Sequence, residues 1–509
     1  METAKRVAKN TAILYVRMAI TVFISLYSTR LILAGLGVSD FGLFNLVGGV
    51  ISMLGFLNSS MAAATQRFMS FAQGAGDLEK VKRIFNMSSI LHLGIAVLVL
   101  LLLEGAGYFF FNGALNITPN RLEVAKFIYQ FMVISTIFTV ISVPYDAVIT
   151  SHENMIVYAI MGVIEAVLKL CIALYITYTN TDHLLVYGIL MAILSILLLV
   201  IKRVYCHQVY HECHLQLTKY YDKSLLKEMG AFAGWELLAS STSMLSFYGQ
   251  TLVVNLFFGT IINSAQAIAT HISGQLGIFS LTLSKALNPI IDRSQGAGNK
   301  GLMLNATYLG TRVTFFLLTI LYIPFIIEMP NILKFWLVLA PEITILFCRL
   351  LLISNLFEQF SIVLNSSILS TGNIKGYKII SSIILFFPLL FSYYLFHLGF
   401  PSYVIYFVFI ISKILLIFNA VYFSKITFKL SPYYFLINIV VKGLLLFSIS
   451  LLITFLLSTF FKNGTYKLII SFILGPLIYL SLNWIWGVNN SERGLIKISI
   501  RSIFLKLYK

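Results

Sequence analysis

Basic side chains inside apolar segments are the residues of this chain most clearly suited to binding a ligand. A charged side chain at the centre of a membrane helix costs about 2.5–3.5 kcal/mol, so each should face a polar cavity, pair with an acid or extend toward the interface. In a wet cavity, arginine and lysine can bind phosphate oxygens by charge-assisted hydrogen bonds. The basic residues that remain inside apolar segments are Arg17, Arg30, Arg67, Lys169, Lys285, Arg312, Arg349 and Lys413.

Arg17 is the first candidate for a cation in a cavity. Asn10, Arg17, Thr21 and Ser28 fall within about 20° of one direction on a helix, so they form a polar stripe along an apolar segment. The alternative is that Arg17 extends to the interface about two turns away. Arg30 points to the opposite face near the outer end, where a cavity and the interface are equally compatible with it.

Two further cations lie at similar depths in different segments. Arg67 is near the inner end of the second apolar segment, on a face that it shares with Ser60 and Ala64, and Lys285 is near the inner end of the eighth. Extension toward the interface is again the alternative for Arg67.

Acidic residues inside the apolar segments offer partners for some of these cations. Glu165 precedes Lys169 by four residues, the favourable spacing for a helical ion pair. We interpret the pair as mainly structural, with gating or proton coupling as the alternative role. Glu104 has no partner nearby in the sequence and keeps a coupling role open, while Glu358 is a possible partner for Arg312, Arg349 or Lys413.

The composition places these residues in a membrane protein. Of 509 residues, 59% are hydrophobic and 11% are charged, which is far more apolar than a soluble domain. We assign 23 lysines and arginines to connections on one side of the membrane and five to the other side, and this bias puts both termini in the cytoplasm. The net charge of +17 is therefore spread over many short loops, which disfavours nucleic acid binding. The first apolar run is too long for a signal peptide.

Fourteen apolar runs are long enough to cross a bilayer as helices. An even number agrees with both termini lying on one side. We expect an all-α integral membrane protein with spans at residues 11–35, 41–69, 88–111, 124–149, 156–179, 184–205, 234–258, 264–291, 306–328, 343–370, 378–397, 402–422, 434–460 and 467–487.

A short motif occurs twice and predicts an internal repeat. Residues 73–77 read QGAGD and residues 295–299 read QGAGN, and the same offset of 222 positions pairs Gly37 with Gly259. Both motifs follow even-numbered spans, so the copies have the same orientation and form parallel repeats around a central cavity. Chance recurrence of a glycine-rich loop is the alternative. The expected organisation is an N-terminal lobe at 1–205, a connector at 206–233, a C-terminal lobe at 234–422, and two extra spans with a basic tail at 423–509.

The connector holds residue types that can bind metal, although their spacing is unusual. Cys206, His207, His211, Cys213 and His214 lie close together in the sequence but lack the paired spacing of a structural zinc site. We therefore expect no metal, and prefer an amphipathic connector lying on the membrane surface. The four cysteines lie in spans or on the cytoplasmic side, so no disulfide is implied. No phosphate-binding loop is visible, and we expect neither ATP nor another cofactor.

Two segments carry a resemblance to a known family. Residues 58–77 (NSSMAAATQRFMSFAQGAGD) and 222–235 (DKSLLKEMGAFAGW), with the span count and the terminal pair, resemble bacterial Wzx-type polysaccharide flippases. These belong to the multidrug/oligosaccharidyl-lipid/polysaccharide exporter superfamily. The resemblance implies a non-enzymatic transporter of the bacterial inner membrane. It would move an undecaprenyl-diphosphate-linked oligosaccharide from the inner to the outer leaflet by alternating access, for O-antigen or other surface polysaccharide synthesis.

The resemblance also implies which residues and partners take part. Cations on the first, second and eighth helices would bind the substrate in a cavity between the lobes, which here are Arg17, Arg30, Arg67 and Lys285. Membrane lipids, a polysaccharide polymerase and glycosyltransferases are the further partners expected.

Two other functions remain open. A cation-coupled multidrug pump of the same fold would need a carboxylate in the membrane, which Glu104, Glu165 or Glu236 could supply. A membrane-embedded polymerase or glycosyltransferase is less favoured, because the outer connections are short and carry few acids.

Overall fold

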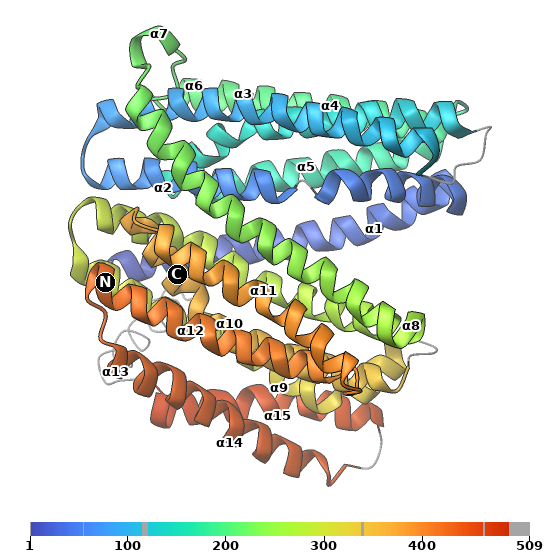
Figure 1. Ribbon diagram of the computed structural model, residues 1–509, viewed down its shortest axis with the longest axis vertical. Coiled ribbons are helices and arrows are strands. Elements are labelled where there is room, and N and C mark those ends of the chain that lie inside the picture. The colour runs from blue at the N-terminus through green and yellow to red at the C-terminus, as the bar shows by residue number, and fades with distance from the viewer. Residues whose placement is uncertain (1, 54, 115–120, 337–340, 462–463, 488–509) are drawn as a thin grey trace, which may run out of the picture. The chain divides into compact units, whose positions relative to one another are not determined.

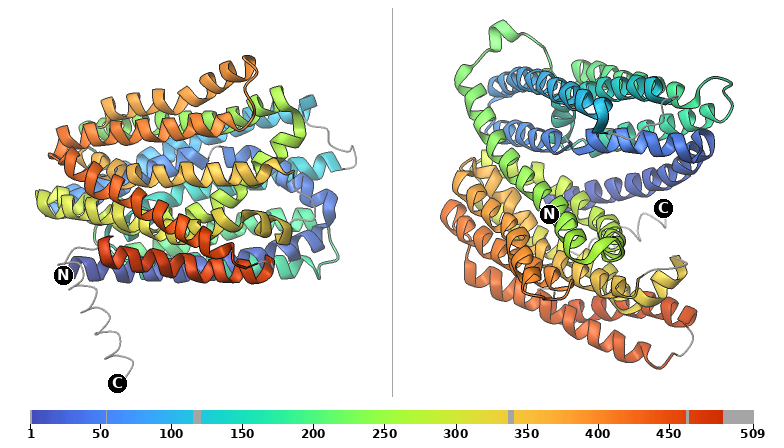
Figure 2. Two further views of the ribbon diagram at one scale, coloured as in Figure 1. Left: turned by 90° about the horizontal axis from the view of Figure 1, so that it is seen from below. Right: turned by 45° about the vertical axis from the view of Figure 1, so that its right-hand side comes forward.

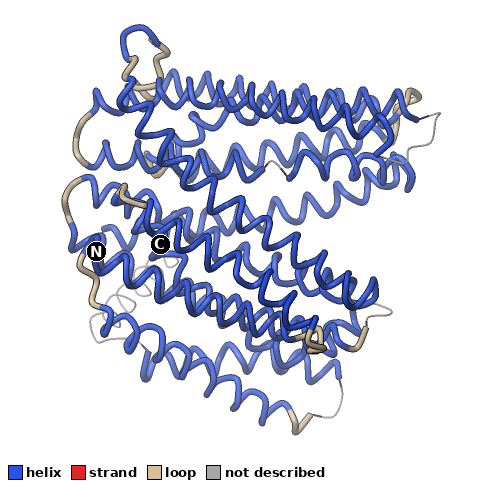
Figure 3. The backbone as a smooth tube through the Cα atoms, viewed as in Figure 1, coloured by secondary structure: helices blue, strands red, loops and turns tan. Residues whose placement is uncertain are grey.

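A computed structural model of the chain describes residues 2–53, 55–114, 121–336, 341–461 and 464–487. Within these ranges the chain forms helices joined by short turns and contains no strand (Figure 3). This confirms the expected all-helical architecture.

The helices belong to two compact units. The N-terminal unit comprises residues 8–241 and 288–299, and the C-terminal unit comprises residues 1–7, 242–287 and 300–509. In the N-terminal unit, α4 packs against both α3 and α6 (Figure 1). In the C-terminal unit, α10 packs between α9 and α12, and α15 packs on α9 (Figure 2).

The first half of the chain forms helices α1 to α8. They are α1 (Glu2–Met53), α2 (Gly55–Gly74), α3 (Leu78–Phe109), the π-helix η1 (Phe110–Ala114), α4 (Leu122–Ser151), α5 (Met155–Ile176), α6 (His183–Val209), α7 (Leu217–Tyr220) and α8 (Lys223–Gly296).

The second half of the chain forms the remaining helices. They are α9 (Lys300–Trp336), α10 (Ile343–Thr371), α11 (Lys375–His397), α12 (Val404–Phe428), α13 (Pro432–Phe435), η3 (Leu436–Val441), α14 (Lys442–Ser458), α15 (Gly464–Leu482) and η4 (Asn483–Gly487).

Ten helices of the described residues are long and apolar enough to cross a membrane. They coincide with ten of the fourteen expected spans. The other four expected spans lie on α1, α2 and α8. Between the two expected spans in each case the backbone leaves the helical conformation, at Gly37 in α1 and at Gly259 in α8, so each element consists of two helices joined at a bend.

The two kinks show the internal repeat in the backbone. Gly37 has φ +74° and Gly259 has φ +73°, a conformation that only glycine adopts readily. The QGAG turns behave in the same way, since Gly76 has φ +76° and Gly298 has φ +70°. Both pairs are 222 residues apart, so the predicted repeat places matching bends at matching positions.

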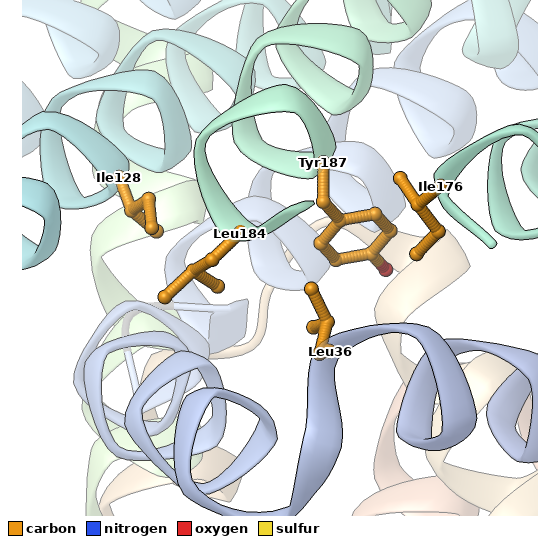
Figure 4. Packing of buried hydrophobic residues seen from close by; sticks show 5 residues of the cluster. All are labelled: Leu36, Ile128, Ile176, Leu184 and Tyr187. Atoms are coloured by element: carbon orange, nitrogen blue, oxygen red, sulfur yellow. The ribbon is translucent and has the colours of Figure 1, made fainter. Parts of the chain in front are cut away.

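One end of the N-terminal unit is held by an apolar cluster and a polar cluster side by side. At the end opposite the QGAG turns, Leu36, Ile128, Ile176, Leu184 and Tyr187 form an apolar cluster (Figure 4). A polar cluster lies at the same end of these helices.

In that polar cluster, one guanidinium joins three elements. Arg121 precedes α4 and contacts Asp182, which caps α6, and its Nη2 lies 2.6 Å from Asp40 Oδ2 on α1. His183 Nδ1 also lies 2.5 Å from the carbonyl oxygen of Gly35. The kinked part of α1 is thus fixed to α4 and α6 by charge and hydrogen bonding.

Candidate functional site

Arg17 lies against α5, where a glycine makes room for it. Its guanidinium carbon is 4.5 Å from the centre of the Tyr158 ring, and a Cβ atom added to Gly162 would overlap the guanidinium. The Nε of Arg17 is buried and has no hydrogen-bond partner among the described residues. A cation held on an aromatic face with an unused donor is suited to receive an anion.

A chain of charges continues from Arg17 along α5. Glu165 Oε1 lies 2.7 Å from Lys169 Nζ, so the expected i,i+4 pair is present, and Glu165 is also close enough to Arg17 and Lys202 to interact electrostatically. Lys202 Nζ is in turn 2.7 Å from Asp146 Oδ2.

Sequence reasoning missed the second of these pairs. Asp146 on α4 and Lys202 on α6 are 56 residues apart, so no local spacing indicates the pair. The packing of α4 on α6 brings the two charges together.

Arg67 on α2 is buried among aromatic rings. Its side chain is 7% exposed, and its guanidinium carbon lies 4.6, 5.1 and 5.2 Å from the ring centres of Phe68, Phe71 and Phe232. Asp292 and Glu228 are close enough to interact electrostatically with it. Arg67 is therefore covered by protein, rather than extended to an interface.

The other expected site residues are Arg30, Lys285 and Glu104. The backbone of Arg30 is in α1, but its side chain lies outside the described part of the structure. Lys285 is exposed on α8 within the C-terminal unit. Glu104 on α3 is exposed and accepts a hydrogen bond from Gln130 on α4 over 3.1 Å. The structure therefore brings Arg17, Glu165 and Lys169 together and leaves Glu104 outside this group.

The other cations inside spans have identifiable structural partners in the C-terminal unit. Lys413 Nζ lies 2.8 Å from Glu358 Oε1, and Arg312 Nη2 donates to the Tyr434 hydroxyl over 2.9 Å. Arg349 donates to the carbonyl oxygens of Ile326 and Ile327 at 2.7 and 3.1 Å. These residues stabilise helix contacts.

The connector is held against α3 and its histidines and cysteines form no metal-binding group within the described residues. Asn86 accepts from the backbone N–H of Gln216 over 2.9 Å and donates to the carbonyl of His214 over 3.1 Å. A hydrogen bond with Cys206, together with burial, raises the pKa of the Cys213 thiol. A protonated thiol is a poor metal ligand, because the thiolate is the binding form.

A hydrogen bond fixes the same connector to the α4–α5 turn. His152 Nε2 lies 2.5 Å from Glu212 Oε1, and the His152 and Tyr210 rings stack with centres 4.4 Å apart. Burial alone would raise the pKa of the Glu212 carboxyl, but the hydrogen bond with His152 lowers it overall.

Comparisons with known proteins identify the fold. No protein-family model matches the chain, and no curated protein sequence matches it. A MOP superfamily transporter from Pyrococcus furiosus, described by the reverse polarity of its binding pocket, is 13% identical with a TM-score of 0.71, and the match covers 84% of this chain and 97% of that one.

Two further solved structures are similar to the same extent. One is the outward-facing conformation of a multidrug resistance MATE family transporter of the MOP superfamily, and the other is a MATE in the bent conformation. Each is 14% identical with a TM-score of 0.73, and each match covers 84% of this chain and 96% of the other. At these identities the comparison shows that the chain has the MATE transporter fold.

Proposed function

We propose that this protein is a flippase that moves an undecaprenyl-diphosphate-linked oligosaccharide from the inner to the outer leaflet of a bacterial inner membrane. The observation that carries the proposal is Arg17. Its guanidinium lies over Tyr158 and in the space left by Gly162, and its Nε has no hydrogen-bond partner among the described residues. A diphosphate headgroup presents the oxygens that such a donor binds best.

The neighbouring charges suit transient binding of an anion. Glu165 is paired with Lys169 and interacts with Arg17, so the group carries two cations for one carboxylate. An anion entering this group would gain charge-assisted hydrogen bonds from Arg17 and would be repelled by Glu165. Balanced attraction of this kind favours binding and release in each transport cycle.

The membrane potential supplies a driving force without ATP. With the cytoplasm negative, outward movement of an anion is favoured by about 2.3 kcal/mol per charge per 100 mV. The undecaprenyl chain would remain in the lipid, while the diphosphate headgroup and the sugars would contact polar residues of the protein. The resident partners would be membrane lipids and the enzymes that make and polymerise the oligosaccharide.

Export in vesicles tests this function. A vesicle assay with a fluorescent undecaprenyl-diphosphate-linked oligosaccharide should show strong loss of flipping when Arg17, Arg67 and Lys285 are all replaced by alanine. Arg312→Ala is the matched control, because Arg312 donates to Tyr434 and is not one of the proposed substrate-binding cations. Unchanged flipping in the triple variant would remove the proposal that these cations bind the substrate.

A cation-coupled multidrug pump is the second candidate. Two of the similar structures are described as MATE transporters, one of them for multidrug resistance, and Glu165 provides a carboxylate within an apolar helix. This candidate predicts that vesicles take up a lipophilic cation in a pH or sodium gradient and that Glu165→Gln abolishes the uptake. The flippase proposal predicts no such uptake.

A further inference from the structure

The end of α8 returns to the N-terminal unit, to which the start of the helix also belongs. Residues 242–287 of this helix belong to the C-terminal unit, whereas residues 288–299 belong to the N-terminal unit. Pro289 lies where the chain passes from one unit to the other, and it cannot donate the helical hydrogen bond to residue 285. A proline at this position allows the helix to bend there.

The segment 288–299 crosses the end of α2 through two glycines. A Cβ atom added to Gly74 would overlap the carbonyl of Arg293, and one added to Gly296 would overlap the carbonyl of Phe71. Gly74 and Gly296 are 222 residues apart, as are Phe71 and Arg293. The contact is therefore reciprocal, and each copy of the repeat supplies the glycine that admits the backbone of the other.

Arg293 ties the segment to two turns at the same end of the unit. Its Nη2 donates to Gln73 Oε1 over 2.9 Å and to the carbonyl of Ser151 over 2.7 Å, and its Nη1 lies 3.0 Å from Glu153 Oε1. Gln73 also donates to the Ser151 hydroxyl over 3.2 Å. One side chain thus joins α8 to the end of α2 and to the α4–α5 turn.

Asp292, the residue before Arg293, interacts with a cation. Asp292 is 5% exposed and interacts with Arg67, which also interacts with Glu228. Neighbouring residues of α8 therefore engage an arginine on α2 and a glutamate after α4. The Asp292 carboxylate therefore lies near Arg67, a cation that is expected to bind substrate.

We propose that residues 288–299 form a releasable latch, held by the Gly74–Gly296 crossing and by Asp292 and Arg293, and that its release uncovers Arg67. The proposal rests on the transport function, since it assigns a conformational step to that cycle. In the closed latch Arg67 is almost fully buried, so an anionic headgroup meets it only after Asp292 has moved away. The segment also buries Ile290 and Ile291, so opening the latch means releasing apolar packing as well as the polar contacts and the glycine crossing.

Spin labels on the two QGAG turns test the latch directly. Ala75 and Ala297 are exposed and occupy equivalent repeat positions, so Ala75→Cys and Ala297→Cys place one label on each side of the crossing. Cys171 is replaced by serine because it is exposed, while the other three cysteines are buried. The distance between labels is measured by double electron–electron resonance in the full-length protein in lipid nanodiscs.

Two variants should open the latch and two matched variants should not. Arg293→Ala removes three polar contacts, and Gly296→Val drives a side chain into the Phe71 carbonyl, so each should raise the ratio of long to short distances about tenfold or more. Arg83→Ala removes an exposed arginine whose pair with Asp222 spans 3.6 Å, and Gly94→Val adds a side chain where a Cβ meets nothing within 4 Å. Neither control should change the ratio.

The measurement tests the latch independently of the proposed substrate. The distances are measured without substrate, so a latch that opens in Arg293→Ala supports the inference even if vesicles show no oligosaccharide flipping. An unchanged short distance in Arg293→Ala would overturn the latch, and that variant keeps the test decisive if Gly296→Val fails to fold. Equal opening in the two controls would also overturn it, because it would indicate general loosening.

Discussion

Arg349 supplies a hydrogen bond that a proline removes from the neighbouring helix. Pro330 lies inside α9 and has no N–H, so the carbonyl of Ile326 loses its helical donor. Arg349 Nε on α10 donates to that carbonyl over 2.7 Å, and Nη2 donates to Ile327 over 3.1 Å. We predict that Arg349→Met destabilises the protein chiefly because it leaves the Ile326 carbonyl unsatisfied.

The size of the effect follows from these contacts. Hydrogen bonds between membrane helices contribute about 0.6–1.7 kcal/mol each. A buried carbonyl left without a donor costs about 1–3 kcal/mol. We therefore expect Arg349→Met to lower the free energy of unfolding by about 2–4 kcal/mol. The methionine side chain retains much of the apolar packing, so packing loss adds little.

A double-mutant cycle with Pro330→Ala isolates the reason. Alanine restores the N–H that bonds the Ile326 carbonyl within α9, so Arg349→Met should cost about 1–2 kcal/mol less in that background. Unfolding would be followed in mixed detergent micelles by the fluorescence of the native tryptophans. Equal costs of Arg349→Met with and without Pro330 would refute the account of the proline-freed carbonyl.

Three further predictions concern the N-terminal unit. Gly162→Ala should displace Arg17 and reduce oligosaccharide flipping about tenfold, whereas Gly94→Ala, where a Cβ meets nothing, should leave vesicle transport unchanged. Because the pKa of Glu212 is lowered, its stabilisation of the connector is complete above the unfolded pKa of about 4.3 and is lost as the pH falls through the folded value. Hydrogen exchange, corrected for intrinsic rates, should show a looser connector in acid, and Glu212→Gln should show this already at pH 7. Asn86→Ala should increase proteolysis of the connector about tenfold, because it removes two hydrogen bonds to that segment.

The sequence predicts well what depends on periodicity and on local spacing. Helix content follows from apolar runs of bilayer length, and the Glu165–Lys169 pair follows from a four-residue spacing. The offset of 222 residues identifies Gly37 and Gly259 as equivalent. It does not predict how sharply the chain turns there, because a one-residue bend and a longer loop use the same residue type.

Contacts between distant segments are what the sequence cannot provide. Nothing local indicates that Lys202 meets Asp146, or that Arg293 lies beside Gln73, 220 residues earlier. In the sequence the QGAG motifs indicate only a repeat that follows two spans, whereas in the structure Gly74 and Gly296 also admit a neighbouring backbone. That role depends on tertiary packing, which side-chain periodicity does not encode.

The lipid-linked intermediate in cells that lack the protein tests the proposed function most directly. Mass spectrometry of inner-membrane lipids, with leaflet assignment by accessibility to a membrane-impermeant sugar-modifying reagent, would identify the cargo. We predict that an undecaprenyl-diphosphate-linked oligosaccharide accumulates in the inner leaflet and that the wild-type protein, but not the Arg17→Ala variant, removes the accumulation. An unchanged lipid profile together with new sensitivity to lipophilic cations would contradict the flippase and favour the multidrug pump.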